Sequence, residues 1–351
     1  MRIDASRLTS FGDAGESVFC LITSPELTDR FAVTPGPRYG TAQVIPFAGT
    51  ADFAEFLATS VPQRADLLVV LPNVYFRSPT PAELGPHRKL AVMAVTSTPS
   101  SLESIAHFIR MGERTDPAAQ ERLADSIFSR GRRAERLVFV DEDYGTSAVF
   151  DHLAEELQWH EQGGYLDWGQ QQLFPSGEVS VLPVDVFGQD VDRTFALDGE
   201  IALRGCPVVH SGTPSFLPAD QERIFRNLAS MRDAAVVVTV RDGVAVEFEA
   251  TGEAARPAAR TLAALADVDS RFGTLLEIGF GLNTGIELFP GNSAMNEVYG
   301  GVAGTIHFGF GLIPYTQYHI DLICPGTRVV DERGEPVFGT GAAHEQRGAS
   351  A

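Results

Sequence analysis

The feature that most constrains the fold is a change of hydrophobic pattern near residue 145. Before that point, apolar runs of strand length alternate with segments of helical periodicity. The strand-like runs are 17–23 (SVFCLIT), 65–72 (ADLLVVLP), 89–97 and 136–142, and the helical segments are 50–61, 101–112 and 116–131. This alternation predicts an α/β domain with a largely parallel sheet over residues 1–145.

After that point, short strands separated by glycines replace most helical patterns. The expected strands include 177–186, 235–250 and 274–283, with one helix at 257–268 and a hairpin turn at Asp242-Gly243. A further helix is expected around His152 and His160. The sequence therefore predicts a β-rich (α+β) domain over 146–338, followed by a disordered tail at 339–351.

Composition narrows the possible functions. The net charge of -19 would repel a phosphate backbone, which argues against nucleic-acid binding. No run of eighteen apolar residues and no signal-peptide pattern is present. The three cysteines form no CxxC pair, and neither GxGxxG after the first strand nor GxxxxGK[ST] occurs. We therefore expect a cytoplasmic protein that binds neither nucleic acid nor membrane.

Residues 304–323 (GTIHFGFGLIPYTQYHIDLI) contain two histidines and an aspartate. Side chains alternate along a strand, so His319 and Asp321 share one face, with Cα atoms about 6.5–7 Å apart. His307 shares its face with Gly309 and Gly311, which leave space beside the imidazole. These two strands are candidates for the walls of a metal site.

Two glutamates lie in comparable settings. Glu277 is followed on its own face by glycines, and Glu178 comes directly after a Pro-Ser-Gly turn. His210 ends a strand-like run and could line a cleft. Oxygen and nitrogen donors without thiolates suit zinc, manganese, cobalt or iron(II). A solvated acid or a hydrogen-bonded histidine would give the same local pattern, so each residue alone also fits a purely structural role.

The order of these motifs resembles a known family. The blocks PSGEV, LEIGFGLNTGI, NEVYGGVAGTIHFGFG and YHIDL resemble, in this order, the C-terminal blocks of the aminopeptidase T family of metallo-exopeptidases. The resemblance implies an α/β domain followed by a β-rich metal-bearing domain, two metal ions, and an enclosed site in a homodimer. It also implies five metal ligands, which are Glu178, Glu277, His307, His319 and Asp321.

The reaction expected from this resemblance is hydrolysis of an amide or peptide bond. Two zinc, cobalt or manganese ions would activate a water molecule and polarise the scissile carbonyl. Glu178, Tyr315 and Tyr318 are the candidates for handling protons. The expected substrate is a small peptide or a compound derived from an amino acid.

Two alternatives stay open. The chain is also similar to the 2,5-dihydroxypyridine dioxygenases, which use one iron(II) held by two histidines and an aspartate; His307, His319 and Asp321 would supply that set. Glu277 stands where those enzymes have a histidine. The third possibility is a non-catalytic binding protein on the same fold. Metal content distinguishes the three.

Overall fold

The computed structural model describes residues 1–184 and 195–339. The chain divides into two compact units. Unit 1 comprises residues 1–121, 162–177 and 285–295, and unit 2 comprises the remainder. The expected domain boundary at residue 145 stays a prediction, and nearly all of the expected disordered tail lies outside the described residues. None of the helices in the described ranges has the length and apolar character needed to cross a membrane.

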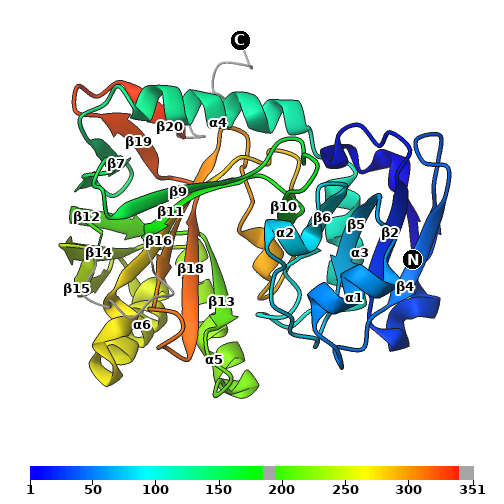
Figure 1. The fold of residues 1–351 in the computed structure, drawn as a ribbon. Coiled ribbons are helices and arrows are strands. Elements are labelled where there is room, and N and C mark those ends of the chain that lie inside the picture. The colour runs from blue at the N-terminus through cyan, green and yellow to red at the C-terminus, as the bar shows by residue number, and fades with distance from the viewer. Residues whose placement is uncertain (185–194, 340–351) are drawn as a thin grey trace, which may run out of the picture. The chain divides into compact units, whose positions relative to one another are not determined.

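Unit 1 contains the expected parallel sheet (Figure 1). Its strands, in order across the sheet, are β10 (Gln171–Phe174), β6 (Arg88–Met93), β5 (Ala65–Val70), β2 (Val18–Thr23) and β4 (Ala42–Pro46). A separate pair is formed by β1 (Arg2–Asp4) and β3 (Ala32–Thr34). Three of the strand predictions are thereby confirmed, namely those at 17–23, 65–72 and 89–97.

The helices of unit 1 begin where side chains cap free backbone N–H groups. Asp52 accepts hydrogen bonds from the first turn of α1 (Phe53–Ser60), and capping boxes precede α2 (Pro81–Leu84) and α3 (Leu102–Gly112). The fourth helix, α4 (Pro117–Gly131), begins in unit 1 and continues into unit 2. The helices predicted at 50–61, 101–112 and 116–131 are confirmed.

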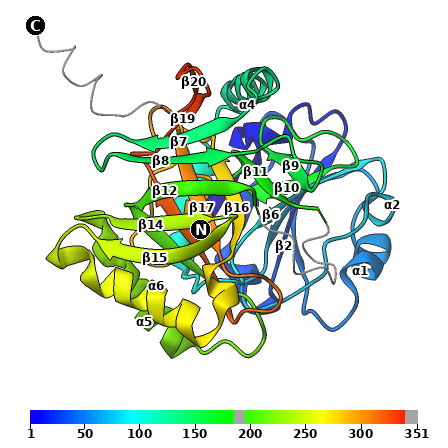
Figure 2. The ribbon, with the colours of Figure 1, turned by 90° about the vertical axis from the view of Figure 1, so that its left-hand side faces the viewer.

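Unit 2 contains two largely antiparallel sheets. Sheet C runs in the order β15 (Val244–Ala250), β14 (Val236–Arg241), β12 (Leu197–Leu203), β8 (Thr146–Phe150), β7 (Leu137–Asp141), β19 (Arg328–Asp331), β20 (Pro336–Phe338). Sheet D runs in the order β13 (Cys206–Ser211), β18 (Tyr318–Cys324), β17 (Thr305–Phe310), β16 (Leu275–Gly281), β11 (Glu178–Pro183), β9 (Leu157–Gln162). Figure 2 shows the strands β7, β8, β12, β14 and β15 following one another across sheet C.

Two local predictions for this unit are wrong. The strand predicted at 136–142 exists as β7, but it pairs antiparallel with β8 and β19 and belongs to no parallel sheet. The helix expected around His152 and His160 is instead a turn followed by β9, because the polar alternation of that segment suits an outer strand of sheet D.

Other expectations for unit 2 are confirmed. The hairpin turn joins β14 to β15, with positive φ angles of 48° at Asp242 and 70° at Gly243. The helix predicted at 257–268 is α6 (Arg256–Val268), which packs beside α5 (Pro218–Leu228) and β15. Short 3₁₀ helices complete the two units at Ala5–Arg7, Thr9–Phe11, Pro25–Arg30, Ala229–Arg232, Glu253–Ala255, Ser270–Gly273 and Ala294–Asn296.

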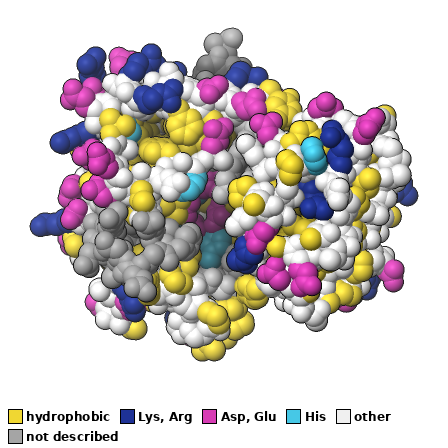
Figure 3. All heavy atoms as spheres, in the orientation of Figure 1, with side chains coloured by type: hydrophobic (Ala, Val, Ile, Leu, Met, Phe, Trp, Pro, Cys, Tyr) yellow, Lys and Arg dark blue, Asp and Glu magenta, His cyan; other side chains and the backbone are white. Residues whose placement is uncertain are grey.

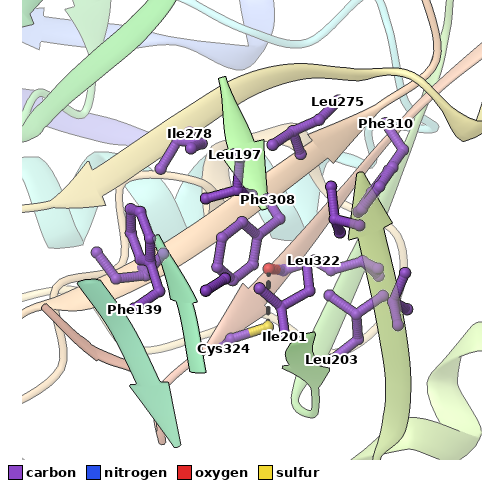
Figure 4. Packing of buried hydrophobic residues seen from close by; sticks show 14 of the residues in the cluster. Phe139, Leu197, Ile201, Leu203, Leu275, Ile278, Phe308, Phe310, Leu322 and Cys324 are labelled. Carbon is purple, nitrogen blue, oxygen red and sulfur yellow. Dashed lines mark hydrogen bonds between the residues drawn. The ribbon is translucent and has the colours of Figure 1, made fainter. Parts of the chain in front are cut away.

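The core of unit 2 lies between sheets C and D. The ring of Phe139 on β7 meets that of Phe308 on β17 edge-on, with centroids 5.5 Å apart. Figure 4 shows this contact among aliphatic side chains from both sheets, including Ile201 and Leu322. Because side chains alternate along each strand, burying Phe308 and Leu322 against sheet C directs His307 and Asp321 to the opposite face of sheet D.

Charged side chains are scattered over the face of the molecule that Figure 3 shows. On the face shown in Figure 3, acidic and basic groups are interspersed with hydrophobic ones. The acidic excess of the chain, -19, is thus accompanied by scattered arginines, as expected of a solvated surface.

Candidate metal centre

The register of sheet D places acids and histidines in neighbouring rows. Asp321 on β18 pairs with Gly309 on β17, which in turn pairs with Glu277 on β16. In the next row, His319 on β18 pairs with His210 on β13. Residues more than 100 positions apart in the sequence are therefore adjacent on one face of the sheet.

Glycines on the intervening strands provide the space for these side chains. A Cβ atom at Gly309 would lie 2.6 Å from Asp321 Oδ1 and 2.8 Å from His319 Nε2. A Cβ atom at Gly279, which pairs with His307, would lie 1.9 Å from His307 Cε1. Any larger residue at either position would displace the polar side chains, so both glycines are explained by the site.

Asp321 is the centre of the cluster, because each of its oxygens faces a different histidine. Oδ1 lies 3.1 Å from His319 Nε2, and Oδ2 lies 3.0 Å from His210 Nε2. His210 Nε2 also contacts a carboxylate oxygen of Glu297, which follows the 3₁₀ helix Ala294–Asn296. The aspartate is fully buried, so its charge is compensated only by these neighbours.

Two further glutamates complete the cluster. Glu277 Oε2 lies 3.7 Å from His319 Nε2, and Glu178 Oε1 lies 3.3 Å from His307 Nε2. Donor atoms in three sets approach closely enough to hold a metal ion: Glu178, Glu277 and His307; Glu277, His319 and Asp321; His210, Glu297 and Asp321. The sets share Glu277 and Asp321, so they form one continuous array.

The backbone fixes the orientation of His319. Its Nδ1 donates a hydrogen bond of 2.9 Å to the carbonyl oxygen of Gly311. Gly311 has a φ of +97°, which favours glycine. Because Nδ1 donates to the backbone, Nε2 is the ring nitrogen directed at Glu277 and Asp321, and it is the atom that would bind a metal.

Burial and mutual repulsion shift the protonation of these groups. Burial raises the pKa of Glu178 well above its usual range, and the nearby charges of Glu277, Glu297 and Asp321 raise it further. Burial would lower the pKa of His319, but the charge of Asp321 outweighs it and raises that pKa well above the usual range. So many carboxylates in one buried place favour a bound cation, which would replace the protons.

Unsatisfied polar atoms provide a test of whether a metal fits. Within residues 1–184 and 195–339, several buried atoms make no hydrogen bond of normal geometry: both ring nitrogens of His307, Nε2 of His319 and both carboxylate oxygens of Asp321. Leaving such atoms unpaired is costly, and buried polar groups in proteins are nearly always satisfied. Carboxylate and imidazole donors without thiolates suit iron(II), manganese or zinc. The residues therefore fit a divalent metal ion.

The structure brings together all five residues proposed as ligands from the sequence. That they bind metal stays a prediction. Glu297 was missed, since it lies in a turn without periodicity, and His210 was recognised only as lining a cleft. The alternative iron set does not form one group, because His307 lies with Glu178 and Glu277 and not with His319 and Asp321.

The two tyrosines have other contacts. Tyr318 OH donates to the backbone oxygen of Leu217 and accepts from its N–H, at the start of α5. The ring of Tyr315 lies 5.9 Å from the guanidinium carbon of Arg271. Their proposed role in proton transfer is not tested by these contacts and stays a prediction.

Comparison with known proteins gives one line of evidence. No family model matches the sequence, and no curated protein matches it. A solved structure of 2,5-dihydroxypyridine dioxygenase from Pseudomonas putida KT2440 is similar, with a TM-score of 0.51 and 13% sequence identity. The match covers 97% of this chain and 98% of that chain. At this identity the similarity shows a shared fold.

This comparison corrects the function expected from the sequence. The interpretation as an amide- or peptide-bond hydrolase is contradicted, because the matched structure is that of a dioxygenase. The resemblance to the aminopeptidase T family receives no support, whereas the related dioxygenase family appears as a distant structural neighbour. The glutamate at position 277 favours the hydrolase in the sequence pattern, but one residue does not identify the reaction.

Proposed function

We propose that the protein is an iron(II)-dependent oxygenase acting on a small, electron-rich hydroxylated ring compound. The observation that carries the proposal is the set of Glu277, His319 and Asp321, whose donor atoms lie close enough together to hold a divalent metal, on a fold shared with a dioxygenase over nearly its whole length. Iron(II) replaces the pair of zinc, cobalt or manganese ions expected for a hydrolase.

Glu277, His319 and Asp321 would hold the iron. A bound iron(II) supplies the electrons that activate dioxygen. The residues of the chain orient the metal ligands and keep the site open and dry. Gly311 holds His319 in one tautomer, and Gly309 keeps the space beside Asp321 and His319 open. Burial of Asp321 excludes water, which strengthens its attraction for a cation.

His210 and Glu297 form the outer part of the array. His210 Nε2 lies between Asp321 Oδ2 and a carboxylate oxygen of Glu297. A protonated His210 would neutralise one of the carboxylates, and its pKa is raised to about 10 because the charges of Glu297 and Asp321 outweigh the effect of burial. This arrangement fixes Asp321 so that Oδ1 faces His319.

Oxygen uptake tests the proposal. Protein purified without oxygen would be loaded with iron(II) and mixed with 2,5-dihydroxypyridine, dihydroxybenzenes and singly hydroxylated analogues. We expect consumption of O₂ in a one-to-one ratio with at least one doubly hydroxylated ring, because a dioxygenase needs no further reductant. Zinc-loaded protein, which has the same charge but no redox activity, is the matched control.

Two results would contradict the proposal. Full iron occupancy without O₂ uptake on any of these rings would refute the oxygenase. Tight binding of a ring compound by metal-free protein would favour the non-catalytic alternative.

The proposal extends to the oligomeric state and the partners of the protein. We infer that the protein acts as a homodimer on a small molecule, without a nucleic-acid partner. The strong negative charge argues against a nucleic-acid partner. The edge strands β15 and β20 of sheet C support a homodimer, because exposed strand edges need protection. Light scattering that gave the mass of one chain would contradict the dimer.

A further inference from the structure

A cavity in unit 1 has the size of a small-molecule site. Its volume is about 670 Å³, within the usual range for ligand pockets. Ser6 and Gly12 line it from the N-terminal segment, and Tyr165 and Trp168 line it from the segment before β10. It is formed entirely by residues of unit 1, whereas the metal-centre residues belong to unit 2.

Two cations line this cavity. Lys89, the only lysine of the chain, is 2% exposed, and its ammonium group donates to the carbonyl oxygens of Phe11 and Asp13. An ammonium group has three donors, so a third N–H remains beyond these two acceptors. In the part of the chain that the structure describes, Nη2 of the half-buried Arg38 makes no hydrogen bond of normal geometry, while Nη1 donates to Leu8.

The negative groups lie in more solvated positions. Asp13 and Asp167 line the same cavity, but both residues are exposed, and Asp13 Oδ1 accepts the N–H of Gly15. Burial lowers the pKa of Lys89, and the charge of Asp66, its partner on the adjacent strand, offsets part of that effect. The nearby carboxylates disfavour a multiply charged anion such as phosphate, whereas the poorly solvated cations favour a single negative charge.

Two aromatic side chains, Tyr165 and Trp168, also line the cavity. Tyr165 is 45% exposed, and the Trp168 ring lies 4.4 Å from Lys89 Nζ and 4.6 Å from the guanidinium carbon of Arg64. Exposed aromatic surface beside charged groups suits a ligand with a flat ring and a charged end.

We propose that this cavity binds a small aromatic monocarboxylate, with its carboxylate against Arg38 and Lys89 and its ring against Tyr165 and Trp168. The site would regulate or accompany whatever reaction unit 2 performs, and it does not depend on the proposed oxygenase. A planar guanidinium suits a carboxylate group better than other anions of the same charge.

Tryptophan fluorescence provides a local measurement. The chain has two tryptophans: Trp168 in the cavity and Trp159 on β9, whose ring packs 5.4 Å from that of Phe280 in unit 2. Titration with benzoate should change the emission saturably, with a Kd of about 1 mM or tighter. Acetate lacks the ring and benzamide lacks the charge, so each should bind at least about tenfold more weakly.

Substitutions in the cavity test whether benzoate binds there. Arg38→Gln should weaken benzoate binding about tenfold or more, whereas Arg110→Gln, an exposed arginine outside the cavity, should leave it unchanged. Trp168→Phe should remove the fluorescence change but keep calorimetric binding. If Arg38→Gln does not fold, Tyr165→Ala serves instead and should weaken benzoate more than acetate.

Carboxylates also bind metal ions, so a second control is needed. Asp321→Asn, which would disrupt the metal centre, should leave benzoate binding unchanged. Loss of benzoate binding in Asp321→Asn, unchanged affinity in Arg38→Gln, or no saturable signal in the parent protein would each overturn the proposal. None of these outcomes bears on oxygen uptake.

Discussion

Gly309 lies directly opposite Asp321 on the adjacent strand, and the missing side chain of the glycine is what makes room for the carboxylate. A Cβ atom there would approach Asp321 Oδ1 to 2.6 Å and His319 Nε2 to 2.8 Å. Both contacts are shorter than van der Waals separation. The positions of Asp321 Oδ1 and His319 Nε2 therefore depend on Gly309, a residue without a side chain.

The first prediction follows from this relationship. Gly309→Ala should lower iron affinity at least about tenfold, because the methyl group would displace Asp321 and His319. It should also cost about 1–3 kcal/mol of stability through overpacking. Gly40→Ala is the matched control, since nothing lies within 4 Å of a Cβ atom at Gly40. Metal analysis of both purified variants decides; equal iron in the two would show that the space beside Gly309 is not needed.

The second prediction concerns Asp321 itself. Asp321→Asn keeps the size of the side chain but removes the charge that faces His210 and His319. We expect iron affinity to fall by more than the roughly 10- to 100-fold that follows loss of a hydrogen-bond partner of a metal ligand. Glu249→Gln, an exposed carboxylate on β15, controls for the change in net charge. Normal iron content in Asp321→Asn would place the metal elsewhere.

The third prediction tests His210. His210→Gln removes the group between Glu297 and Asp321 and should reduce oxygen uptake at least about tenfold, with a smaller loss of iron. The ratio of uptake to bound iron is the informative quantity, because a purely structural role would lower both equally. Circular dichroism of the variant checks that sheet D is intact.

The sequence allowed some of the site to be predicted and not the rest. His319 and Asp321 are two residues apart on one strand, so their shared face follows from strand geometry alone. The pairing of His210 with His319 instead depends on β13 and β18 being neighbours, with more than 100 residues between them. No local pattern encodes that register, and Glu297, in a turn, shows no periodicity at all.

The same limit applies to the fold. The sequence predicts the parallel strands β2, β5 and β6 from apolar runs that alternate with helical segments, such as 50–61 between β2 and β5 and 101–112 after β6. β7 has the same kind of apolar run, yet it pairs antiparallel with β8 and β19, which lie on either side of it in sheet C. An apolar run shows that a strand is buried but does not identify its partner.

The last prediction concerns Asp66 on β5, which is fully buried and accepts a hydrogen bond of 2.7 Å from Tyr39. Burial raises its pKa to about 6, and the hydrogen bond from Tyr39 and the charge of Lys89 offset only part of that effect. The folded state therefore holds this proton more tightly than the unfolded chain, whose aspartates have a pKa of about 3.9. The contribution of Asp66 to the free energy of unfolding should fall as pH rises from about 4 to about 6, by roughly 3 kcal/mol in total.

Asp66→Asn should remove this dependence, because an amide cannot ionise yet can still accept the hydrogen bond from Tyr39. Denaturant unfolding, followed by Trp168 fluorescence in a Trp159→Phe background so that the signal reports on unit 1, measures the free energy of unfolding at several pH values. Subtracting the free energy of unfolding of the variant from that of the parent at each pH separates the contribution of Asp66 from those of the buried acids in unit 2. Asp29→Asn, at an exposed position of unit 1, should give a flat difference. A difference for Asp66→Asn that stays constant between pH 4 and 6, or that rises with pH, would mean that the folded state does not retain a proton on Asp66.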